Sequence, residues 1–528
     1  MPLFLETPHG SLGITSQLMR ASPNTTLPSQ SISVFSDIIG RESGGRSIVL
    51  GETRRSYSEL CAAAESIAKR LRALGLSRGA RVGICLDQGF EYIAGLLGVW
   101  QAGGISVLMS PGWTMHERER VLKHSGASFM LAEALQITQT SPIYSASLGE
   151  LNCVLTQYAE PEDSGKAETG DAVIIYTSGS TGSPKGVVLT EAGISANVSA
   201  VCEYLSLENK DSAAIFTPSC YAYSLSQNLA QAWSGGSMVP FPSGLRFPLD
   251  ILQSASLHRI TGISATPTAF RMLCDTGMGT NLDLDSVRFI MCGGQPLHNS
   301  LVERIRSLFR KAKIINMYGC TENSPRISYH YVSGTAGMDE RGYCSVGRPV
   351  RGTQIQIATD DKQPAGSGQV GEILISGTSM MRAYWQEGCE TDNRVRNGWF
   401  HTRDLGYLDG HGLLHLTGRE STIINVGNEK VSPEEVEKIL LEFSGVSDVA
   451  VFGMPDSLLG EAVAAQVAIE KGSGIRSEDI QRYCRTKLSS YKIPKEIVFV
   501  DKIPRTLYGK VDRNRLRPDI YGNTKTDD

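Results

Sequence analysis

The segment Tyr176–Gly186, with the sequence YTSGSTGSPKG, is the feature that most constrains the fold of this chain. The run that leads into it from residue 171 is β-branched and aromatic, as is typical of a buried strand, and the apolar run Val187–Leu189 follows it. We therefore predict a loop between two strands. Its glycines permit close backbone approach, its serines and threonines offer hydroxyl groups, and Lys185 adds a positive charge. Together these groups suit a bound polyphosphate.

The loop differs from the Walker motif of P-loop ATPases. No Gly-Lys-Ser/Thr sequence follows a glycine at the required spacing, and no helical pattern begins at the lysine. A P-loop ATPase is therefore disfavoured. A Ser/Gly-rich surface loop is the alternative that this segment alone leaves open.

The first third of the chain alternates between helical and strand patterns. A capping box, Ser56-Tyr-Ser-Glu59, predicts the start of a helix whose apolar positions recur at helical spacing as far as Leu74. A strand over 81–85, a helix over 91–101 and a strand over 104–109 follow. This alternation predicts an α/β fold with parallel sheets covered by helices.

Three later segments each consist of an apolar strand that runs into a Gly/Pro/Thr turn, over 264–268, 288–297 and 314–322. Because ligands of open α/β sheets bind at the carboxyl ends of strands, we expect these turns to line one crevice. From residue 370 onward, short strands over 371–376, 399–404, 406–409 and 413–416 predict a small β-rich subdomain. The residues Ser432-Pro-Glu-Glu435 predict the start of a capped helix in a second βα pattern. We therefore predict an N-terminal domain over 1–419 and a small α+β C-terminal domain over 420–528.

Composition excludes some classes of function. The chain has 51 basic and 55 acidic residues and a net charge of −4, so it offers no electrostatic case for nucleic acid or an anionic membrane as partner. The 11 cysteines are scattered without a Cys-x-x-Cys pair, which favours reduced thiols and gives no zinc signature. The N-terminus lacks a signal-peptide pattern and no apolar run is long enough to cross a bilayer, so we predict a cytoplasmic protein without a membrane span.

Taken together, the motifs resemble those of the adenylate-forming superfamily, the AMP-binding enzymes that include acyl-CoA synthetases, peptide-synthetase adenylation domains and luciferases. The matching segments occur in the family's order over nearly the whole chain: Tyr176–Gly186, Tyr318–Glu322, Gly347–Pro349, Gly371-Glu372, Asp404, Gly418-Arg419, Gly427 and Thr506–Lys510. The resemblance implies an AMP-forming acid–thiol ligase. In such an enzyme a carboxylate attacks the α-phosphorus of ATP to give acyl-AMP and pyrophosphate, and a thiol of coenzyme A or of carrier-protein phosphopantetheine then takes the acyl group.

The resemblance also implies roles for individual residues. The catalytic set is Lys510, which would bridge the carboxylate and the α-phosphate, Thr321 at the α-phosphate, Glu322 as a ligand of Mg²⁺, and Lys185 at the outer phosphates. ATP would be held by Thr177, Ser178, Gly179, Ser180, Thr181 and Gly182 in the loop, by Gly293, Gly294 and Gln295 beside the adenine, by Tyr318 stacked on it with Gly319, and by Asp404 and Arg419 at the ribose. The C-terminal domain would rotate about a hinge near Glu420-Ser421 between the two half-reactions, which would bring Gly427 to a pantetheine tunnel.

The acid pocket would be formed by Tyr221, Ala222, Tyr223, Ser224 and Cys320. The segment Tyr221–Ser224 lacks the aspartate with which amino-acid-activating members bind an α-ammonium group, so the sequence favours an uncharged acid without a free α-amine. The tyrosines suit either an aryl acid or an alkyl chain. We expect an aryl or a short- to medium-chain acyl acid, because the segment between Arg348 and Gly371 has no long insertion of the kind typical of fatty acyl-AMP ligases.

One departure from the family's pattern adjoins the site, since Arg403 stands where glycine is common before the aspartate. Two alternative functions also stay open. The acceptor could be an amine or an oxidative step in place of a thiol, or the protein could be a nucleotide-binding regulator without catalysis. The presence of Lys185, Glu322, Asp404, Arg419 and Lys510 disfavours the regulator.

Overall fold

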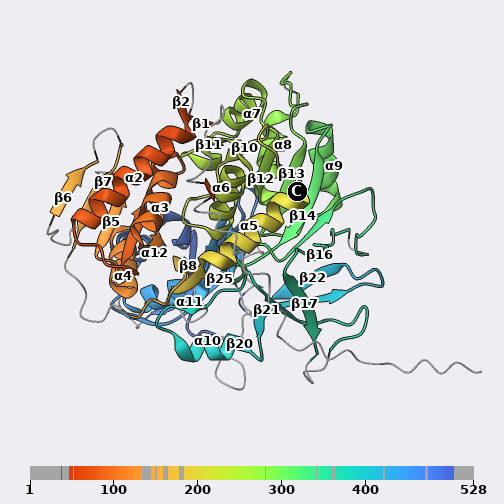
Figure 1. Cartoon of the computed structure of the whole chain (residues 1–528). Coiled ribbons are helices and arrows are strands. Elements are labelled where there is room, and N and C mark those ends of the chain that lie inside the picture. The colour runs from red at the N-terminus through yellow and green to blue at the C-terminus, as the bar shows by residue number, and fades with distance from the viewer. Residues whose placement is uncertain are drawn as a thin grey trace, which may run out of the picture.

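The computed structural model describes residues 37–38, 47–50, 53–133, 144–148, 151–158, 165–177, 184–279, 281–340, 342–359, 364–419, 423–469, 474–504 and 516. Within these ranges the strands form four sheets (Figure 1). Two large sheets carry most of the helices, and two smaller ones follow them in the chain. The α/β class that the sequence predicts is confirmed.

The first large sheet has eight strands in the order β19-β9-β8-β4-β3-β5-β7-β6. The strands β3, β4, β5 and β8 run parallel, as the alternation of patterns predicts. The strands are β3 (Arg81–Cys85), β4 (Ile105–Leu108), β5 (Phe129–Ala132), β6 (Tyr144–Ser147), β7 (Val154–Gln157), β8 (Asp171–Thr177), β9 (Lys185–Thr190) and β19 (Ala383–Tyr384). Four helices accompany them in the chain: α2 (Tyr57–Ala73), α3 (Phe90–Ala102), α4 (Met115–Ser125) and α5 (Glu191–Leu205).

Local sequence signals set the ends of these helices. Ser56 accepts a hydrogen bond from the backbone N–H of Glu59, and the Glu59 carboxylate accepts one from the backbone of Ser56, so the predicted capping box is confirmed. Thr114 and Glu117 form the same device at the start of α4. The strands β8 and β9 pair antiparallel through Tyr176 and Gly186. This confirms the prediction that the segment Tyr176–Gly186 connects two strands.

The second large sheet has nine strands in the order β16-β15-β14-β13-β12-β10-β11-β1-β2. Its central strands from β14 to β1 are parallel, and antiparallel strands close both edges. The strands are β1 (Ser47–Leu50), β2 (Thr53–Ser56), β10 (Ser212–Ile215), β11 (Ser237–Pro240), β12 (Gly262–Ala265), β13 (Phe289–Gly293), β14 (Lys313–Tyr318), β15 (Ser328–Tyr331) and β16 (Arg348–Pro349). Its helical segments are α6 (Ala222–Ser234), η2 (Gly244–Arg246), α7 (Pro248–Leu257), α8 (Pro267–Gly277), α9 (Asn299–Leu308) and η3 (Thr321–Asn323).

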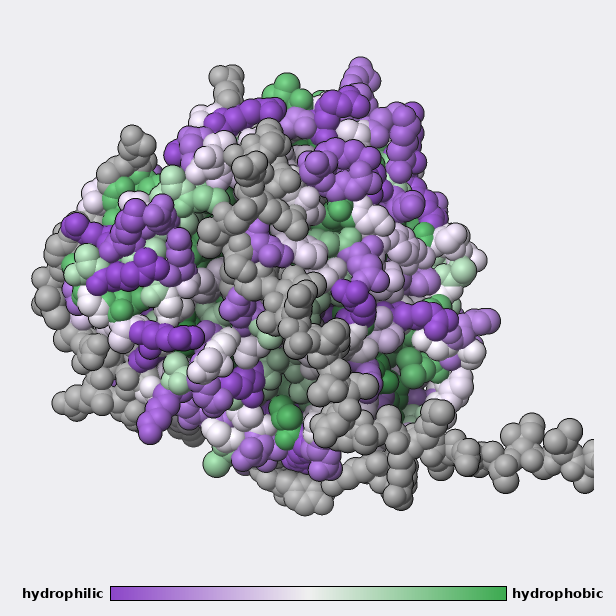
Figure 2. Space-filling view, viewed as in Figure 1, coloured by the Kyte–Doolittle hydropathy of each residue, from purple (hydrophilic) through white to green (hydrophobic). Residues whose placement is uncertain are grey.

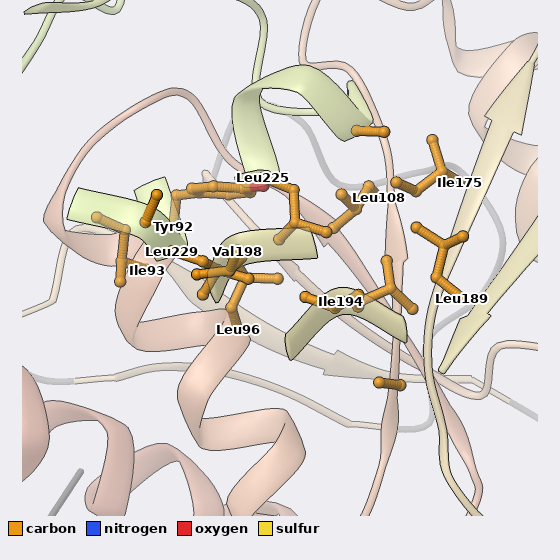
Figure 3. Close-up of a cluster of buried hydrophobic side chains, with 14 of the residues drawn as sticks. Tyr92, Ile93, Leu96, Leu108, Ile175, Leu189, Ile194, Val198, Leu225 and Leu229 are labelled. Atoms are coloured by element: carbon orange, nitrogen blue, oxygen red, sulfur yellow. The ribbon is translucent and has the colours of Figure 1, made fainter. Parts of the chain in front are cut away.

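A buried cluster of aliphatic and aromatic side chains joins the two large sheets. Figure 3 shows its members pointing toward one another from α3, α5 and α6 and from the strands β4, β8 and β9. Fully burying one such side chain contributes about 1.5–3 kcal/mol, so this cluster holds the two halves together strongly. The carboxyl ends of the strands are thereby fixed relative to one another.

The β-rich subdomain contains β17 (Thr353–Ala358), β18 (Gly371–Gly377), β20 (Val395–Arg396), β21 (Trp399–Leu408) and β22 (Leu414–Arg419), with the helix α10 (Gly388–Arg394) before β20. The prediction of separate strands over 399–404 and 406–409 is wrong, because β21 runs through both. The ladder between β21 and β22 shifts register between Leu405 and Gly406, and a Cβ atom at Gly406 would lie 2.4 Å from the carbonyl oxygen of His415. This glycine therefore marks a bulge with close backbone approach rather than a turn.

All described strands from residue 424 onward form a sheet of their own around a separate hydrophobic cluster. They are β23 (Ile424–Val426), β24 (Glu429–Val431), β25 (Val446–Asp456), β26 (Gly460–Ile469) and β27 (Glu496–Phe499), with α11 (Pro433–Leu441), α12 (Ser477–Lys487) and η4 (Ser490–Lys492). Ser432 caps α11 as predicted. The boundary at 419/420 stays a prediction, since residues 420–422 lie outside the described ranges.

The face of the molecule in Figure 2 is mostly hydrophilic, with hydrophobic residues in scattered patches. None of the helices in the described ranges combines the length and the apolar composition that crossing a membrane requires.

Candidate active site

A cavity lies where the carboxyl ends of the parallel strands meet the C-terminal sheet. Its empty volume is about 1410 Å³, including space open to solvent. The structure brings together twelve of the predicted site residues at its walls: Thr177, Tyr221, Ala222, Tyr223, Gly293, Gly294, Gln295, Tyr318, Gly319, Cys320, Thr321 and Gly427. The turns after β12, β13 and β14 thus line one crevice, as the sequence predicts.

The turn after β14 is folded tightly against itself. A Cβ atom at Gly319 would lie 1.8 Å from the carbonyl oxygen of Pro325, so no other residue fits at this position without moving the backbone. The backbone N–H of Ile327 donates to the carbonyl oxygen of Tyr318 at 3.0 Å. This fold places Thr321 and Arg326 on the same wall of the cavity.

Tyr318 and Asp404 are joined at the base of this wall. The Tyr318 hydroxyl donates to the Asp404 carboxylate at 2.5 Å, and both residues are buried. Burial, together with the Asp404 charge, raises the pKa of Tyr318 well above its usual value, so the hydroxyl stays a donor. Asp404 itself does not line the cavity, and its predicted role at the ribose stays a prediction.

Arg403, the residue before Asp404, stands where glycine is common in the family. Arg403 has a φ of 60°, in the left-handed region, where glycine is the residue without steric cost. Its backbone N–H donates to the Glu372 carboxylate at 3.0 Å, and this hydrogen bond helps to hold the conformation.

Lys185 and Glu322 lie beside the cavity rather than in its wall. Lys185 is buried and pairs with Glu390 at 2.7 Å, while the Tyr384 hydroxyl donates to Glu322 at 2.7 Å. Glu390 and Tyr384 were missed by sequence reasoning, because nothing in their local pattern indicates contact with the loop. The loop residues Ser178, Gly179, Ser180, Thr181 and Gly182 lie outside the described ranges.

Mg²⁺ prefers one or two carboxylates together with phosphate oxygens and water. Glu322 fits this use, since its carboxylate accepts a hydrogen bond from a neutral tyrosine and no cation pairs with it among the described residues. The described residues contain no cluster of three or more His, Cys, Asp or Glu side chains that would bind a metal without phosphate.

Ser224 lies away from the cavity. It hydrogen bonds with Gln88 and with Asn228, and all three side chains are buried. Tyr221 is the N-terminal cap of α6, and Ser224 lies in the first turn of this helix. A helix turns successive residues by 100°, so Tyr221 and Tyr223 reach the cavity while Ser224 does not.

The C-terminal sheet contributes the remaining wall. The Gln295 amide donates to the carbonyl oxygen of Gly427 at 3.0 Å, and hydrogen bonds join Thr266 with Asn428 and Tyr221 with Glu429. Gly427 has a φ of +62°, which favours glycine independently of any tunnel. These hydrogen bonds join the C-terminal sheet to residues of the cavity wall that lie more than a hundred positions earlier in the chain.

A buried cluster of charges also joins the two parts, and none of its members was predicted. Lys492 lies 2.9 Å from Glu117 and 3.2 Å from Glu435, and Arg120 lies 2.7 Å from Glu435. Burial acts to lower the pKa of Lys492, but the Glu435 and Glu117 carboxylates outweigh it and raise that pKa. Burial likewise acts to raise the pKa of Glu117, but Lys492 and the Ser489 hydroxyl reverse this, and the pKa falls below its usual value.

Several predicted site residues are described by the structure only in part or not at all. Lys510, Glu420 and Ser421 are outside the described ranges, and of Arg419 only the backbone is described, paired with Asp404 between β22 and β21. Their roles stay predictions.

The chain matches known protein families and relatives over most of its length. The family model for AMP-binding enzymes matches residues 39–385, and that for the C-terminal domain of AMP-binding enzymes matches residues 435–510. A feruloyl-CoA synthase of Amycolatopsis is 30% identical over 472 residues, which cover 88% of this chain and 94% of the relative. A long-chain-fatty-acid–CoA ligase of Escherichia coli O157:H7 is 28% identical, covering 85% and 87%.

Among solved structures, the o-succinylbenzoate CoA synthetase MenE of Bacillus subtilis is 28% identical over 92% of this chain and 98% of its own. The complex of its double mutant with the product analogue OSB-NCoA superposes with a TM-score of 0.79. The complexes with AMP and with the acyl-adenylate OSB-AMP have the same identity and coverage but a TM-score of 0.64.

The present structure superposes more closely on the complex with the product analogue than on the complexes with AMP and OSB-AMP. The family models, the relatives and the fold agree with one another over both parts of the chain. This chain belongs to the AMP-binding enzyme family, and it is an acid–thiol ligase of the acyl-CoA synthetase type.

Proposed function

We propose that this enzyme converts a carboxylic acid and ATP to acyl-AMP and pyrophosphate, and then transfers the acyl group to coenzyme A or to carrier-protein phosphopantetheine. The acid is an aryl or a short- to medium-chain acyl acid without a free α-amine. The observation that supports this proposal most is the closed arrangement, in which Gly427 lies against Gln295 at the wall of the cavity.

The first half-reaction demands alignment and charge neutralisation, because a carboxylate is repelled by the polyphosphate that it attacks. In our proposal Thr321 contacts the α-phosphate, the loop from Thr177 and Lys185 hold the outgoing phosphates, and Lys510 bridges the two reacting groups. A magnesium ion, when bound by Glu322 and the phosphates, supplies further positive charge. Tyr318 and Asp404 position the adenosine.

The second half-reaction needs a path for a thiol to the acyl carbonyl, with AMP as the leaving group. Gly427 presents no side chain at the wall, so a narrow pantetheine arm can pass it. The relationship to a feruloyl-CoA synthase and the position of Tyr221 and Tyr223 in the cavity support an aryl acid.

The substitution Gly427→Trp tests this proposal. Acid-dependent exchange of pyrophosphate with ATP should stay within about threefold of wild type, while formation of the CoA thioester falls at least about 100-fold, since an indole blocks the path. The matched control is Gly410→Trp, because Gly410 is exposed and a Cβ atom there meets open space. Equal loss of both half-reactions in Gly427→Trp alone would contradict the thiol path.

The same assays separate the alternatives. Turnover of acyl-AMP to a stable product without any thiol would support an amine or oxidative acceptor. Absence of exchange with every acid of a broad panel, from correctly folded protein, would support a regulator without catalysis.

A further inference from the structure

Arg326 is a buried arginine in the wall of the cavity whose charge has no carboxylate partner among the described residues. The residue is 2% exposed and is one of the largest fully buried side chains. Its Nε and Nη2 atoms are both buried, and neither has a hydrogen-bond partner in the described part of the chain. Leaving such donors unpaired is costly, and most buried arginines are paired.

The two unpaired nitrogens form one edge of the guanidinium, and this protein uses the same edge elsewhere to hold carboxylates. Arg288 binds Asp211 through Nε and Nη2, both at 2.6 Å, and Arg382 binds Asp171 through the same atoms at 2.7 and 3.0 Å. Those two arginine side chains are 37% and 24% exposed. Arg326 is thus the most buried of these three arginines and the one whose Nε/Nη2 edge has no partner among the described residues. This edge, the guanidinium fork, has the geometry to bind a carboxylate through two hydrogen bonds.

The position of this fork is fixed before any ligand binds. The guanidinium carbon lies 3.9 Å from the ring centroid of Tyr223, so the ring covers one face of the guanidinium plane and does not pair with its Nε/Nη2 edge. The backbone carbonyl of Arg326 accepts hydrogen bonds from the side-chain amides of Asn197 at 3.0 Å and Asn323 at 2.8 Å. A fork held in this way loses little freedom when a planar anion binds.

The neighbours of Arg326 do not supply a negative charge. Burial raises the pKa of Tyr223 and of Tyr204, and the Arg326 charge opposes the rise without reversing it, so both hydroxyls stay neutral. The Tyr204 hydroxyl donates to the sulfur atoms of Met291 and Met317 and also interacts with the Arg326 side chain, but as a neutral group it does not balance the charge. None of the described residues supplies the counter-charge, and an anion bound in the cavity that Arg326 lines would supply it.

We propose that Arg326 binds a second carboxylate, carried by the far end of the acid substrate, and that the enzyme activates dicarboxylic acids in preference to monocarboxylic ones. This inference rests on the proposed function and names the substrate class of the same site. One carboxylate reacts with ATP and the other stays in the fork. It changes the expectation from the sequence, which considered Tyr221–Ser224 alone and favoured an uncharged acid.

The test compares succinate, glutarate, adipate and isophthalate with the monomethyl ester of each, as substrates of acid-dependent pyrophosphate exchange. The ester keeps the reacting carboxylate and the length of the acid but removes the second charge. We expect wild type to prefer at least one diacid over its half-ester by about 100-fold in kcat/KM, since the half-ester leaves the buried fork unpaired.

Arg326→Met should lower kcat/KM for that diacid about 100-fold and leave the half-ester within a few-fold, so that the preference disappears. Arg351→Met, which removes an exposed arginine paired with Glu203, is the matched control and should keep the preference. Arg326→Lys keeps the charge but lacks the fork, and should give an intermediate preference. Because the readout is a ratio for one protein sample, a loss of folded protein does not change it.

Three results would overturn the inference. Wild type could use half-esters and plain monocarboxylic acids as well as every diacid, Arg326→Met could keep the preference, or it could lower exchange equally for diacid and half-ester, as a contact with ATP would. A failure of the proposed function looks different, because it gives no exchange with any acid, whether diacid, half-ester or aryl monoacid.

Discussion

Two buried cations line the same cavity, and they differ in how their charge is balanced. Lys492 lies between Glu117 and Glu435, which come from the two parts of the chain that close the cavity. Arg326 lies over Tyr223 without a carboxylate among the described residues. Both residues are more than nine-tenths buried, so solvent balances neither charge.

The comparison of Lys492 with Arg326 distinguishes a buried charge that stabilises the fold from one that we propose to bind a ligand. The charge of Lys492 is satisfied within the protein, and its partners fix the C-terminal sheet against α4. The charge of Arg326 has no carboxylate partner among the described residues, and in our proposal a substrate carboxylate in the cavity balances it. Substitutions at the two positions should therefore change stability in opposite directions.

The largest effect is expected for Lys492→Met, which leaves Glu117 and Glu435 buried with too little positive charge. Breaking one side of a buried pair costs about 3–5 kcal/mol, and this loss should appear in urea unfolding. We also expect thioester formation to fall much more than pyrophosphate exchange, because the cluster joins the two parts in a structure that superposes more closely on the product-analogue complex than on the adenylate complexes.

The matched variant is the triple substitution Glu117→Gln, Glu435→Gln and Lys492→Met, which removes the cluster's carboxylates together with the lysine. It should recover a large part of the lost stability, since the only charge of this group left without its partner is Arg120, whose side chain is 28% exposed. No recovery at all would mean that the shape of Lys492, rather than its charge, matters.

A smaller effect that depends on pH is expected for Glu117→Gln. The pKa of Glu117 is lowered from its usual value of 4.5, so its ionised form contributes stability above pH 4.5, and this contribution is lost as pH falls through the lower pKa of the folded state. The variant should be about 1–3 kcal/mol less stable than wild type at pH 7. Urea unfolding of both proteins as pH is lowered below 4.5 should bring the two curves together, and a constant difference would contradict the assignment.

The smallest effect, with the opposite sign, is expected for Arg326→Met in the absence of substrate. Methionine fills much of the same volume and removes a buried charge without a partner, while the loss of the contact with Tyr223 offsets part of the gain. The variant should be as stable as wild type or more stable by about 1 kcal/mol in urea unfolding. A loss comparable to that of Lys492→Met would show that a hidden partner already balances Arg326.

These comparisons also show what the sequence could predict. Capping boxes, the loop between β8 and β9 and the turns after β12, β13 and β14 are local patterns, so the fold class and most of the cavity wall followed from them. The N-terminus of α6 at Tyr221 could not be predicted in this way, because aromatic residues are compatible with both a strand end and a helix start.

The charged residues of the cavity could not be found in this way. Glu117 and Lys492 are 375 positions apart, and only their contact in the folded chain makes either one buried. Arg326 follows the Tyr318–Glu322 motif closely, yet an arginine after a Ser-Pro pair is most often exposed. Burial and the lack of a partner are properties of the fold, and these properties distinguish Arg326 from other arginines.

The central claim is that this cavity activates an acid with ATP and passes the acyl group to a thiol. The most direct test is one sample with ATP, Mg²⁺ and the acid panel, in which pyrophosphate exchange is measured first and thioester formation after coenzyme A or a phosphopantetheine-bearing carrier is added, with Lys510→Ala as control. We predict acid-dependent exchange without a thiol, a thioester only after the thiol is added, and loss of exchange in the control. Exchange with no acid at all, a final product that needs no thiol, or full exchange in Lys510→Ala would contradict the account.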